Sequence, residues 1–133
     1  MELFVTDLDG TLLNKDREVS EYSKNIINSL IDKGRKFTVA TARTPATAVD
    51  ILSGLNLNTP VALMNGVVIY DIKKQEYIDI KAIEELAVNK VLSIIENHNK
   101  NALVYGIKDN HLWVYHKEFE NPWEVNFYKE RAN

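Results

Sequence analysis

The chain has 133 residues, of which 45% are hydrophobic and 26% charged, and its formal net charge is −3. Such a chain can bury a real core, and its slight negative charge, without a dense Lys/Arg stripe, argues against nucleic-acid binding. The absence of cysteine excludes disulfides and thiolate metal sites. We find no signal peptide and no apolar span of membrane length, so we expect a cytoplasmic protein that does not enter membranes.

The first eighty residues alternate between strand and helix patterns. Short apolar runs predict strands at residues 3–6, 37–41 and 60–66. Apolar residues recur at helical spacing in residues 20–34 and 44–54. A capping residue begins each helix and a glycine ends it: Ser20, Thr44, Gly34 and Gly54. This alternation predicts an α/β fold with a Rossmann-like parallel sheet, and residues 67–80 predict a hairpin at its edge.

The pattern changes at about Lys81. Residues 82–100 predict an amphipathic helix, and two strand-like runs follow at residues 102–107 and 111–116. The tail, residues 117–133, has apolar residues but no clear period. A helix followed by an antiparallel hairpin predicts a separate α+β module, so we expect two domains, residues 1–80 and 81–133.

Two carboxylates follow the first strand in the stretch "DLDGT". Because side chains alternate in extended chain, Asp7 and Asp9 can point the same way while Leu8 packs away from them. Two like charges at a strand end favour a bound cation, and oxygen ligands suit Mg²⁺. Thr41 and Asn65 also fall at the carboxyl ends of predicted strands, where ligands bind in parallel sheets. Four polar positions are therefore expected to meet at one rim.

The same residues resemble a known family. "DLDGT", "VATAR" and "ALMNGVVIYD" are similar to motifs of the haloacid dehalogenase superfamily, in its Cof-type branch of phosphatases. The resemblance implies a magnesium-dependent phosphohydrolase whose substrate is a small phosphorylated metabolite. Asp7 would be the nucleophile that forms an aspartyl-phosphate, Asp9 the general acid and base, and Thr41 the hydroxyl that holds the phosphoryl group.

Further roles follow from the resemblance alone. Mg²⁺ would be held by the Asp7 carboxylate and the Asp9 backbone carbonyl. Residues that bind the phosphate or lie near the substrate are Leu8, Gly10, Thr11, Ala42, Arg43, Asn65 and Gly66. Ala42 departs from the family, which usually has glycine there, and its methyl group adds bulk near the ligand. Residues 81–133 resemble the start of the family's cap domain.

The family's later lysine and its second acidic pair do not occur in this sequence. We therefore expect an incomplete core, corresponding to about the first half of a full-length relative, and an enzyme that is weak or inactive alone. The first strand, which lies centrally in the family, would be an open apolar edge here. Such an edge invites self-association.

Other functions remain open from the residues. One is a non-catalytic remnant that binds phosphate or a protein partner through the exposed sheet edge. Another is a phospho-accepting receiver domain, but this would need an aspartate closing the third strand, where the sequence has Met64 and Asn65. The aromatic residues of the second half could stack a base or a sugar, although packing is their expected role: Trp113, Tyr115 and Trp123.

Overall fold

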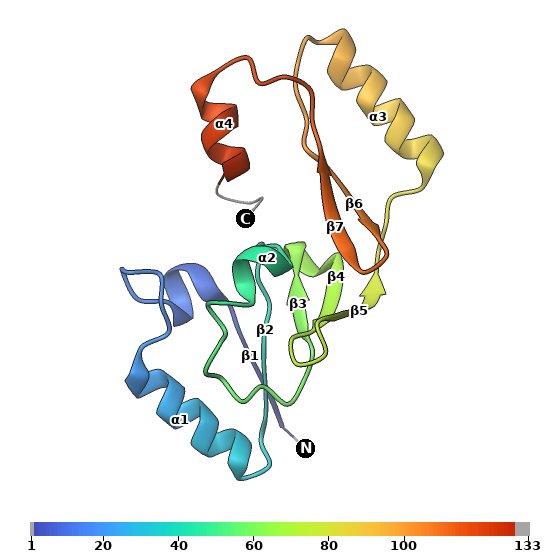
Figure 1. Cartoon of the computed structure of the whole chain (residues 1–133). Coiled ribbons are helices and arrows are strands. Elements are labelled where there is room, and N and C mark those ends of the chain that lie inside the picture. Colours follow the sequence, from blue (N-terminus) through green and yellow to red (C-terminus); the bar gives the residue numbers. More distant parts are fainter. Residues whose placement is uncertain (1, 130–133) are drawn as a thin grey trace. The chain divides into compact units, whose positions relative to one another are not determined.

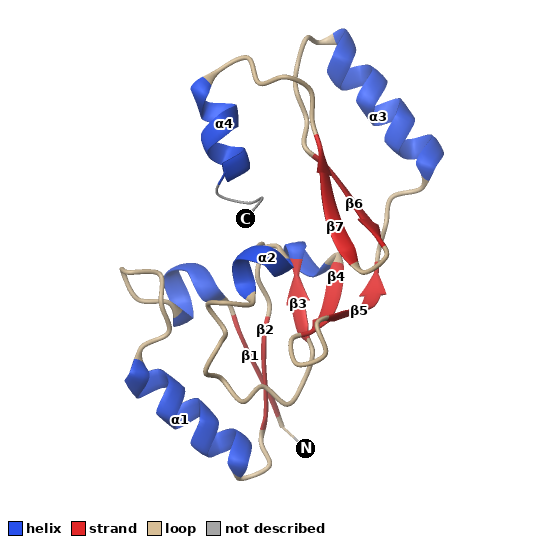
Figure 2. Cartoon of the chain, viewed as in Figure 1, coloured by secondary structure: helices blue, strands red, loops and turns tan. Residues whose placement is uncertain are grey.

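A computed structural model describes residues 2–129 of the chain (Figure 1). The chain divides into two compact units between Ile80 and Lys81. None of the helices in this described part is long and apolar enough to cross a membrane. Each unit has its own helices and strands (Figure 2).

The first unit alternates strands and helices as the sequence predicts. Its elements are β1 (Leu3–Thr6), α1 (Glu21–Asp32), β2 (Lys36–Val39), α2 (Pro45–Ala48), β3 (Val61–Leu63), β4 (Val68–Asp71) and β5 (Glu76–Ile80). β1 and β2 pair in parallel, and β3, β4 and β5 form an antiparallel meander. The two groups meet at one parallel bridge between Ala40 and Ala62. The predicted α/β fold, with an incomplete parallel sheet, is confirmed.

The core of the first unit lies between this sheet and its connecting segments. Its most buried large side chains are Leu8, Val39, Leu52, Val61, Leu63 and Val68. From α1, Ile27 and Ile31 are buried, whereas Tyr22 and Ile26, which also belong to the apolar helical pattern of residues 20–34, are exposed. The buried face of α1 is therefore narrower than the face formed by all of its apolar residues.

α1 begins where the sequence predicts. The Ser20 hydroxyl accepts a hydrogen bond from the Ser23 backbone N–H at 3.1 Å, which satisfies one of the free N–H groups of the first turn. Thr44 stands at the corresponding position before α2, but its hydroxyl lies 3.2 Å from the Thr47 hydroxyl and caps no backbone N–H. Thr44 therefore stands at the predicted N-cap position of α2, but without the hydrogen bond that a capping side chain makes.

β1 lies at an open edge of the sheet. Within residues 2–129 it pairs only with β2. Its three apolar side chains are between 45% and 57% exposed: Leu3, Phe4 and Val5. The expectation of an exposed apolar edge therefore holds for the described part of the chain.

The second unit contains α3 (Glu85–Asn97), β6 (Val104–Lys108), β7 (His111–Tyr115) and α4 (Pro122–Lys129). β6 and β7 form the predicted antiparallel hairpin. α4 occupies the tail, for which the sequence predicted no element. Its signal lies at its first turn, where the Asn121 side chain accepts a hydrogen bond from the Glu124 N–H at 3.1 Å and Pro122 follows directly.

Candidate functional site

A pocket of about 430 Å³ lies at the carboxyl ends of β1, β2 and β3. Its lining comes entirely from the first unit: Asp7, Asp9, Ala40, Thr41, Ala42, Ala62, Asn65 and Gly66. The four polar positions expected at one rim thus line one cavity. Loops that follow parallel strands at the same sheet edge bring together residues far apart in the sequence.

Asp7 and Asp9 reach the pocket because the chain turns sharply after β1. The Leu13 N–H donates to the Leu8 carbonyl at 3.0 Å and closes a wide turn over Leu8–Leu12. Gly10 adopts a φ of 75° within it, a conformation that glycine takes without strain. The Leu8 side chain is fully buried and anchors the turn in the core, while its N–H donates to Asp7 Oδ1 at 2.7 Å.

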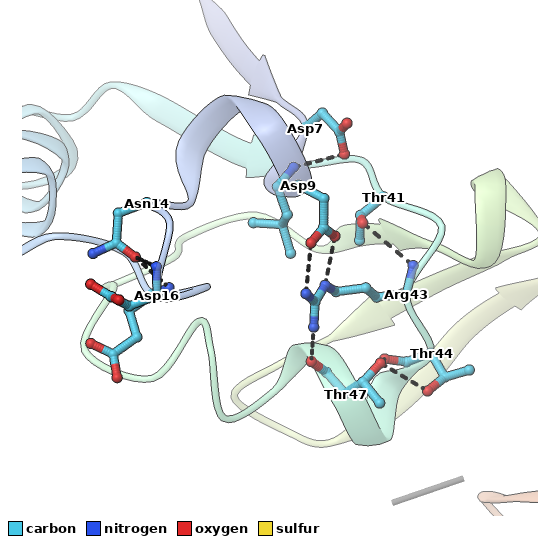
Figure 3. A network of polar contacts seen from close by, with 10 residues as sticks. Asp7, Asp9, Asn14, Asp16, Thr41, Arg43, Thr44 and Thr47 are labelled. Carbon is cyan, nitrogen blue, oxygen red and sulfur yellow. Dashed lines mark hydrogen bonds and ion pairs between the residues drawn. The ribbon is translucent and has the colours of Figure 1, made fainter. Parts of the chain in front are cut away.

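Asp9 forms a two-pronged ion pair with Arg43 (Figure 3). Arg43 Nε donates to Asp9 Oδ2 and Nη2 to Asp9 Oδ1, both at 2.7 Å, while Nη1 donates to the Thr47 carbonyl at 3.3 Å. Hydrogen bonding from Arg43 lowers the pKa of Asp9, against a smaller opposing effect of burial. The same contact raises the pKa of Arg43. Asp9 is therefore held as a carboxylate.

Thr41 lines the pocket and is buried, with 6% of its surface exposed. Its hydroxyl accepts a hydrogen bond from the Arg43 N–H at 3.4 Å (Figure 3). The Thr41 carbonyl accepts from the Asn65 N–H, and the Arg43 carbonyl from the Met64 N–H, both at 3.0 Å. These backbone bonds fix the loop after β3 against the loop after β2, so the positions of Thr41 and Asn65 depend on each other.

Several residues given a site role by the resemblance lie outside this lining. Leu8 is in the core, and Gly10 and Thr11 are exposed on the turn. Arg43 is connected to the pocket through Asp9. Conversely, Ala40 and Ala62 line the pocket, and sequence reasoning missed them because small apolar side chains in strands carry no chemical signal.

The pocket offers few oxygen ligands for Mg²⁺, but they are of a suitable kind. The Asp9 carboxylate is engaged by Arg43, which leaves the Asp7 carboxylate and the Asp9 backbone carbonyl as the oxygen atoms that would hold the ion. In residues 2–129 no three Asp, Glu, His or Cys side chains gather into a fuller metal group. This donor set fits Mg²⁺, which commonly keeps several waters and takes only one or two protein carboxylates together with phosphate oxygens.

Comparisons with known proteins point to one family. A model of the haloacid dehalogenase-like hydrolase family matches residues 4–133. The phosphatase YwpJ of Bacillus subtilis is 32% identical over 99 residues, which are 74% of this chain and 34% of that protein. The 5-amino-6-(5-phospho-D-ribitylamino)uracil phosphatase YcsE of the same organism is 27% identical over 101 residues, 76% of this chain and 40% of that protein.

One solved structure is similar to this chain in fold. A haloacid dehalogenase-like hydrolase from B. subtilis superposes with a TM-score of 0.70 at 27% identity, covering 94% of this chain and 41% of that one. The chain thus spans less than half the length of each of these relatives. Because the family model covers nearly the whole chain, the resemblance carried by "DLDGT" is confirmed, and the chain belongs to the haloacid dehalogenase-like hydrolases, a family with many phosphatases.

Proposed function

We propose that this chain carries the nucleophile side of a magnesium-dependent phosphohydrolase that works through an aspartyl-phosphate. The observation that supports this most is the joint lining of one pocket by Asp7, Asp9 and Thr41. A carboxylate nucleophile, a second carboxylate for proton transfer and a hydroxyl for the phosphoryl oxygens are the groups that this reaction needs.

Asp7 attacks phosphorus through a carboxylate oxygen, forming an acyl-phosphate and releasing the leaving oxygen. The Leu8 N–H, bonded to Asp7 Oδ1, orients the carboxylate so that Oδ2 is the oxygen that attacks. A carboxylate and one phosphate charge about 4 Å apart repel by roughly 4 kcal/mol at an effective dielectric of 20. A magnesium ion held by Asp7 and the Asp9 carbonyl would offset this repulsion.

Asp9 has two tasks that its contact with Arg43 affects in opposite ways. In the first step it gives a proton to the leaving oxygen, and in the second it takes a proton from the water that splits the acyl-phosphate. The Arg43 guanidinium stabilises the carboxylate form, which suits the second step. The first step requires this contact to loosen, so that Asp9 can carry a proton.

The proposed substrate is a small phosphorylated metabolite, and the proposed place of action is the cytoplasm. The name of YcsE, one of the relatives, describes a phosphatase of a ribitylamino-uracil phosphate. That molecule combines a phosphate, a polyhydroxy chain and a ring. A substrate of similar size and charge is consistent with this pocket, whose two carboxylates would act on a phosphate group together with a bound magnesium ion.

A second candidate is a non-catalytic module that binds phosphate or a protein partner. Two observations favour it: no Lys or Arg side chain lines the pocket, and β1 has an open apolar edge in the described part of the chain. Catalysis of phosphoryl transfer depends largely on positive charge around the phosphate. We therefore expect slow turnover from the 133-residue chain.

Phosphate release from p-nitrophenyl phosphate tests the proposal. The purified chain should release phosphate slowly in the presence of Mg²⁺, and a chelator should stop it. Asp7→Asn removes the attacking oxygen's charge while keeping the shape of the side chain, so this variant should fall to the level of the enzyme-free blank. Equal release by the chain and by a folded Asp7→Asn variant would refute the aspartyl-phosphate mechanism.

A further inference from the structure

Three consecutive residues in the turn after β3 have a left-handed backbone. Met64, Asn65 and Gly66 have φ angles of 52°, 58° and 85°. Glycine adopts this conformation freely and asparagine tolerates it, but a methionine is strained there, and runs of such residues are rare. The Met64–Gly66 turn therefore stores strain at the pocket, which Asn65 and Gly66 line.

Few contacts hold the Met64–Gly66 turn closed. The Met64 N–H donates to the Arg43 carbonyl at 3.0 Å. The Asn65 N–H donates to the Thr41 carbonyl at the same distance. No residue of the turn is buried. Because exposed segments with few buried contacts open locally more easily than a packed sheet, we expect this turn to open while the fold remains intact.

The side chain of Asn65 is well placed for deamidation once the turn opens. Asn65 is the only asparagine in the sequence that a glycine follows. Its amide is exposed and forms no hydrogen bond within residues 2–129. Deamidation begins when the backbone nitrogen of the next residue attacks the side-chain carbon Cγ, and a glycine hinders this attack least. The space is open, since a Cβ atom built on Gly66 would meet no atom within 4 Å.

The closed turn keeps the reacting atoms apart. Asn65 has a ψ of 32°, which places the Gly66 nitrogen nearly opposite the Asn65 Cβ across the Cα–C bond. The nitrogen reaches Cγ only after rotation about this bond, and that rotation opens the turn. The rate of reaction therefore depends on how often the turn opens.

We propose that Asn65 is a spontaneous modification site, which deamidates in the folded chain through local opening of the Met64–Gly66 turn. The Gly66 nitrogen forms a bond to Asn65 Cγ, and the C–N bond of the side-chain amide breaks. Ammonia leaves with the proton of the Gly66 N–H, and a succinimide ring remains. Water then opens the ring at either carbonyl and gives an aspartate or an isoaspartate.

Either product changes the pocket. An aspartate adds a third carboxylate to Asp7 and Asp9 in a lining that contains no Lys or Arg side chain. An isoaspartate also lengthens the main chain of the turn by one CH₂ group, next to its hydrogen bond with Thr41. The added negative charge opposes binding of a phosphate ester. This effect rests on the proposed function, whereas the modification itself does not.

Peptide mapping by mass spectrometry measures deamidation at each asparagine, because the reaction raises the mass of a peptide by one unit. The full chain would be kept in mildly alkaline buffer and digested at intervals. Asn28 is the internal control, since it precedes the small residue Ser29 but lies in α1 with its amide bonded at both ends. It donates to the Gly54 carbonyl and accepts from the Asn56 N–H, both at 2.8 Å.

Asn65 should be modified several-fold faster than Asn28. The variant Asn65→Gln has a side chain too long for the five-membered ring, so anion exchange of the aged variant should lack the acidic species that the aged chain acquires. Equal rates at Asn65 and Asn28 would overturn the proposal.

Urea below the unfolding transition distinguishes local opening from complete unfolding. Local opening exposes little surface, so the rate at Asn65 should stay nearly constant as the urea concentration rises in this range. A rate that rises steeply, in proportion to the unfolded fraction, would overturn the proposal, because the folded turn would then protect Asn65.

Phosphate release is measured separately, so that this inference and the proposed function fail independently. Asn65→Asp reproduces the aspartate product and should release phosphate from p-nitrophenyl phosphate several-fold more slowly than the fresh chain. Modification of Asn65 in a chain that releases no phosphate supports the modification site and refutes the phosphatase. Phosphate release by a chain in which Asn65 stays unmodified overturns the modification site alone.

Discussion

The ion pair between Arg43 and Asp9 connects the loop after β1 with the loop after β2 through side chains alone. It orients the Asp9 carboxylate and at the same time stabilises its charged form. The Asp9 side chain remains 53% exposed, whereas that of Arg43 is 18% exposed. Solvent therefore weakens the pair, and its contribution to stability is modest despite the close geometry.

Arg43→Gln should lower the free energy of unfolding at pH 7 by about 0.5–1 kcal/mol. The pKa of Asp9 is lowered in the folded chain, so its stabilising effect is present above the ordinary pKa of an aspartate. As the pH falls through the lower folded pKa, Asp9 takes up a proton and the effect is lost. Urea unfolding of both proteins should therefore show a difference that shrinks below about pH 4.

Lys15→Gln is the control for this comparison, since Lys15 forms no ion pair among the described residues. It removes the same charge and should leave stability nearly unchanged at both pH values. A loss of stability in Arg43→Gln that is the same at every pH would contradict the proposed electrostatic origin.

Part of the site could be predicted from single residues and part could not. Asp7, Asp9, Thr41 and Asn65 follow apolar runs, and parallel strands bring their carboxyl ends together, so their common pocket follows from the chain order. The partner of Asp9 is 34 residues away, and nothing in the sequence selects Arg43 over another cation. Side-chain pairing of this kind depends on rotamers that only the folded loops determine. The catalytic roles of these residues stay predictions.

At the scale of elements, the first turn of α1 depends on Ser20. Its hydroxyl accepts from the Ser23 N–H and also bonds the Ser23 hydroxyl at 2.9 Å. Ser20→Ala should therefore lower the free energy of unfolding by about 1 kcal/mol, because the N–H would lose its acceptor. Chemical denaturation of the two proteins measures the difference.

Ser29→Ala supplies the matched comparison within the same helix. Ser29 is exposed in the interior of α1, where alanine is the better helix former, so this change should leave stability equal or slightly higher. If both serine variants unfold alike, the Ser20 cap contributes nothing.

The helix after β2 shows why periodicity can mislead. Ala48 and Leu52 are buried as their spacing predicts, yet α2 ends at Ala48. Beyond it, the Ser53 N–H and hydroxyl both donate to the Asp50 carbonyl, at 3.1 Å and 2.6 Å. A serine side chain that competes in this way closes a tight turn in place of a helical one. For α4 the error was the opposite: the apolar pattern predicted no helix where one forms. Asn121 and Pro122 are the residues that indicate its start.

At the scale of the whole molecule, the exposed edge of β1 leads us to expect self-association of the chain in solution. Val5→Lys should reduce self-association, because a charged side chain on an edge strand opposes pairing with another chain. Sedimentation velocity over a range of concentrations should show the unmodified chain associating and the variant remaining closer to a monomer. Val5 does not line the pocket, so the substitution leaves every pocket residue unchanged.

Val67→Lys places the same charge at an exposed valine outside the strands, in the turn between β3 and β4. This control should associate like the unmodified chain. Association that is equal in all three proteins would show that the β1 edge plays no part in it.

The change of pattern near Lys81 indicated where the chain would divide, because alternating strands and helices give way there to one helix and a hairpin. The compact units do separate between Ile80 and Lys81. That the second unit begins a cap over the pocket stays a prediction, and so does its role in selecting the substrate. The periodicity of apolar residues predicts single helices and strands. It does not predict how they pack together, so it predicts neither a cap nor its role in substrate selection.

Both tryptophans of the chain, Trp113 and Trp123, belong to the second unit, whereas the pocket belongs to the first. Intrinsic tryptophan emission therefore comes from the hairpin and α4, because the pocket loops contain no tryptophan. An unfolding curve recorded by emission and one recorded by circular dichroism will coincide only if the two units lose structure together. Unequal midpoints would identify the less stable unit without any substitution in the chain.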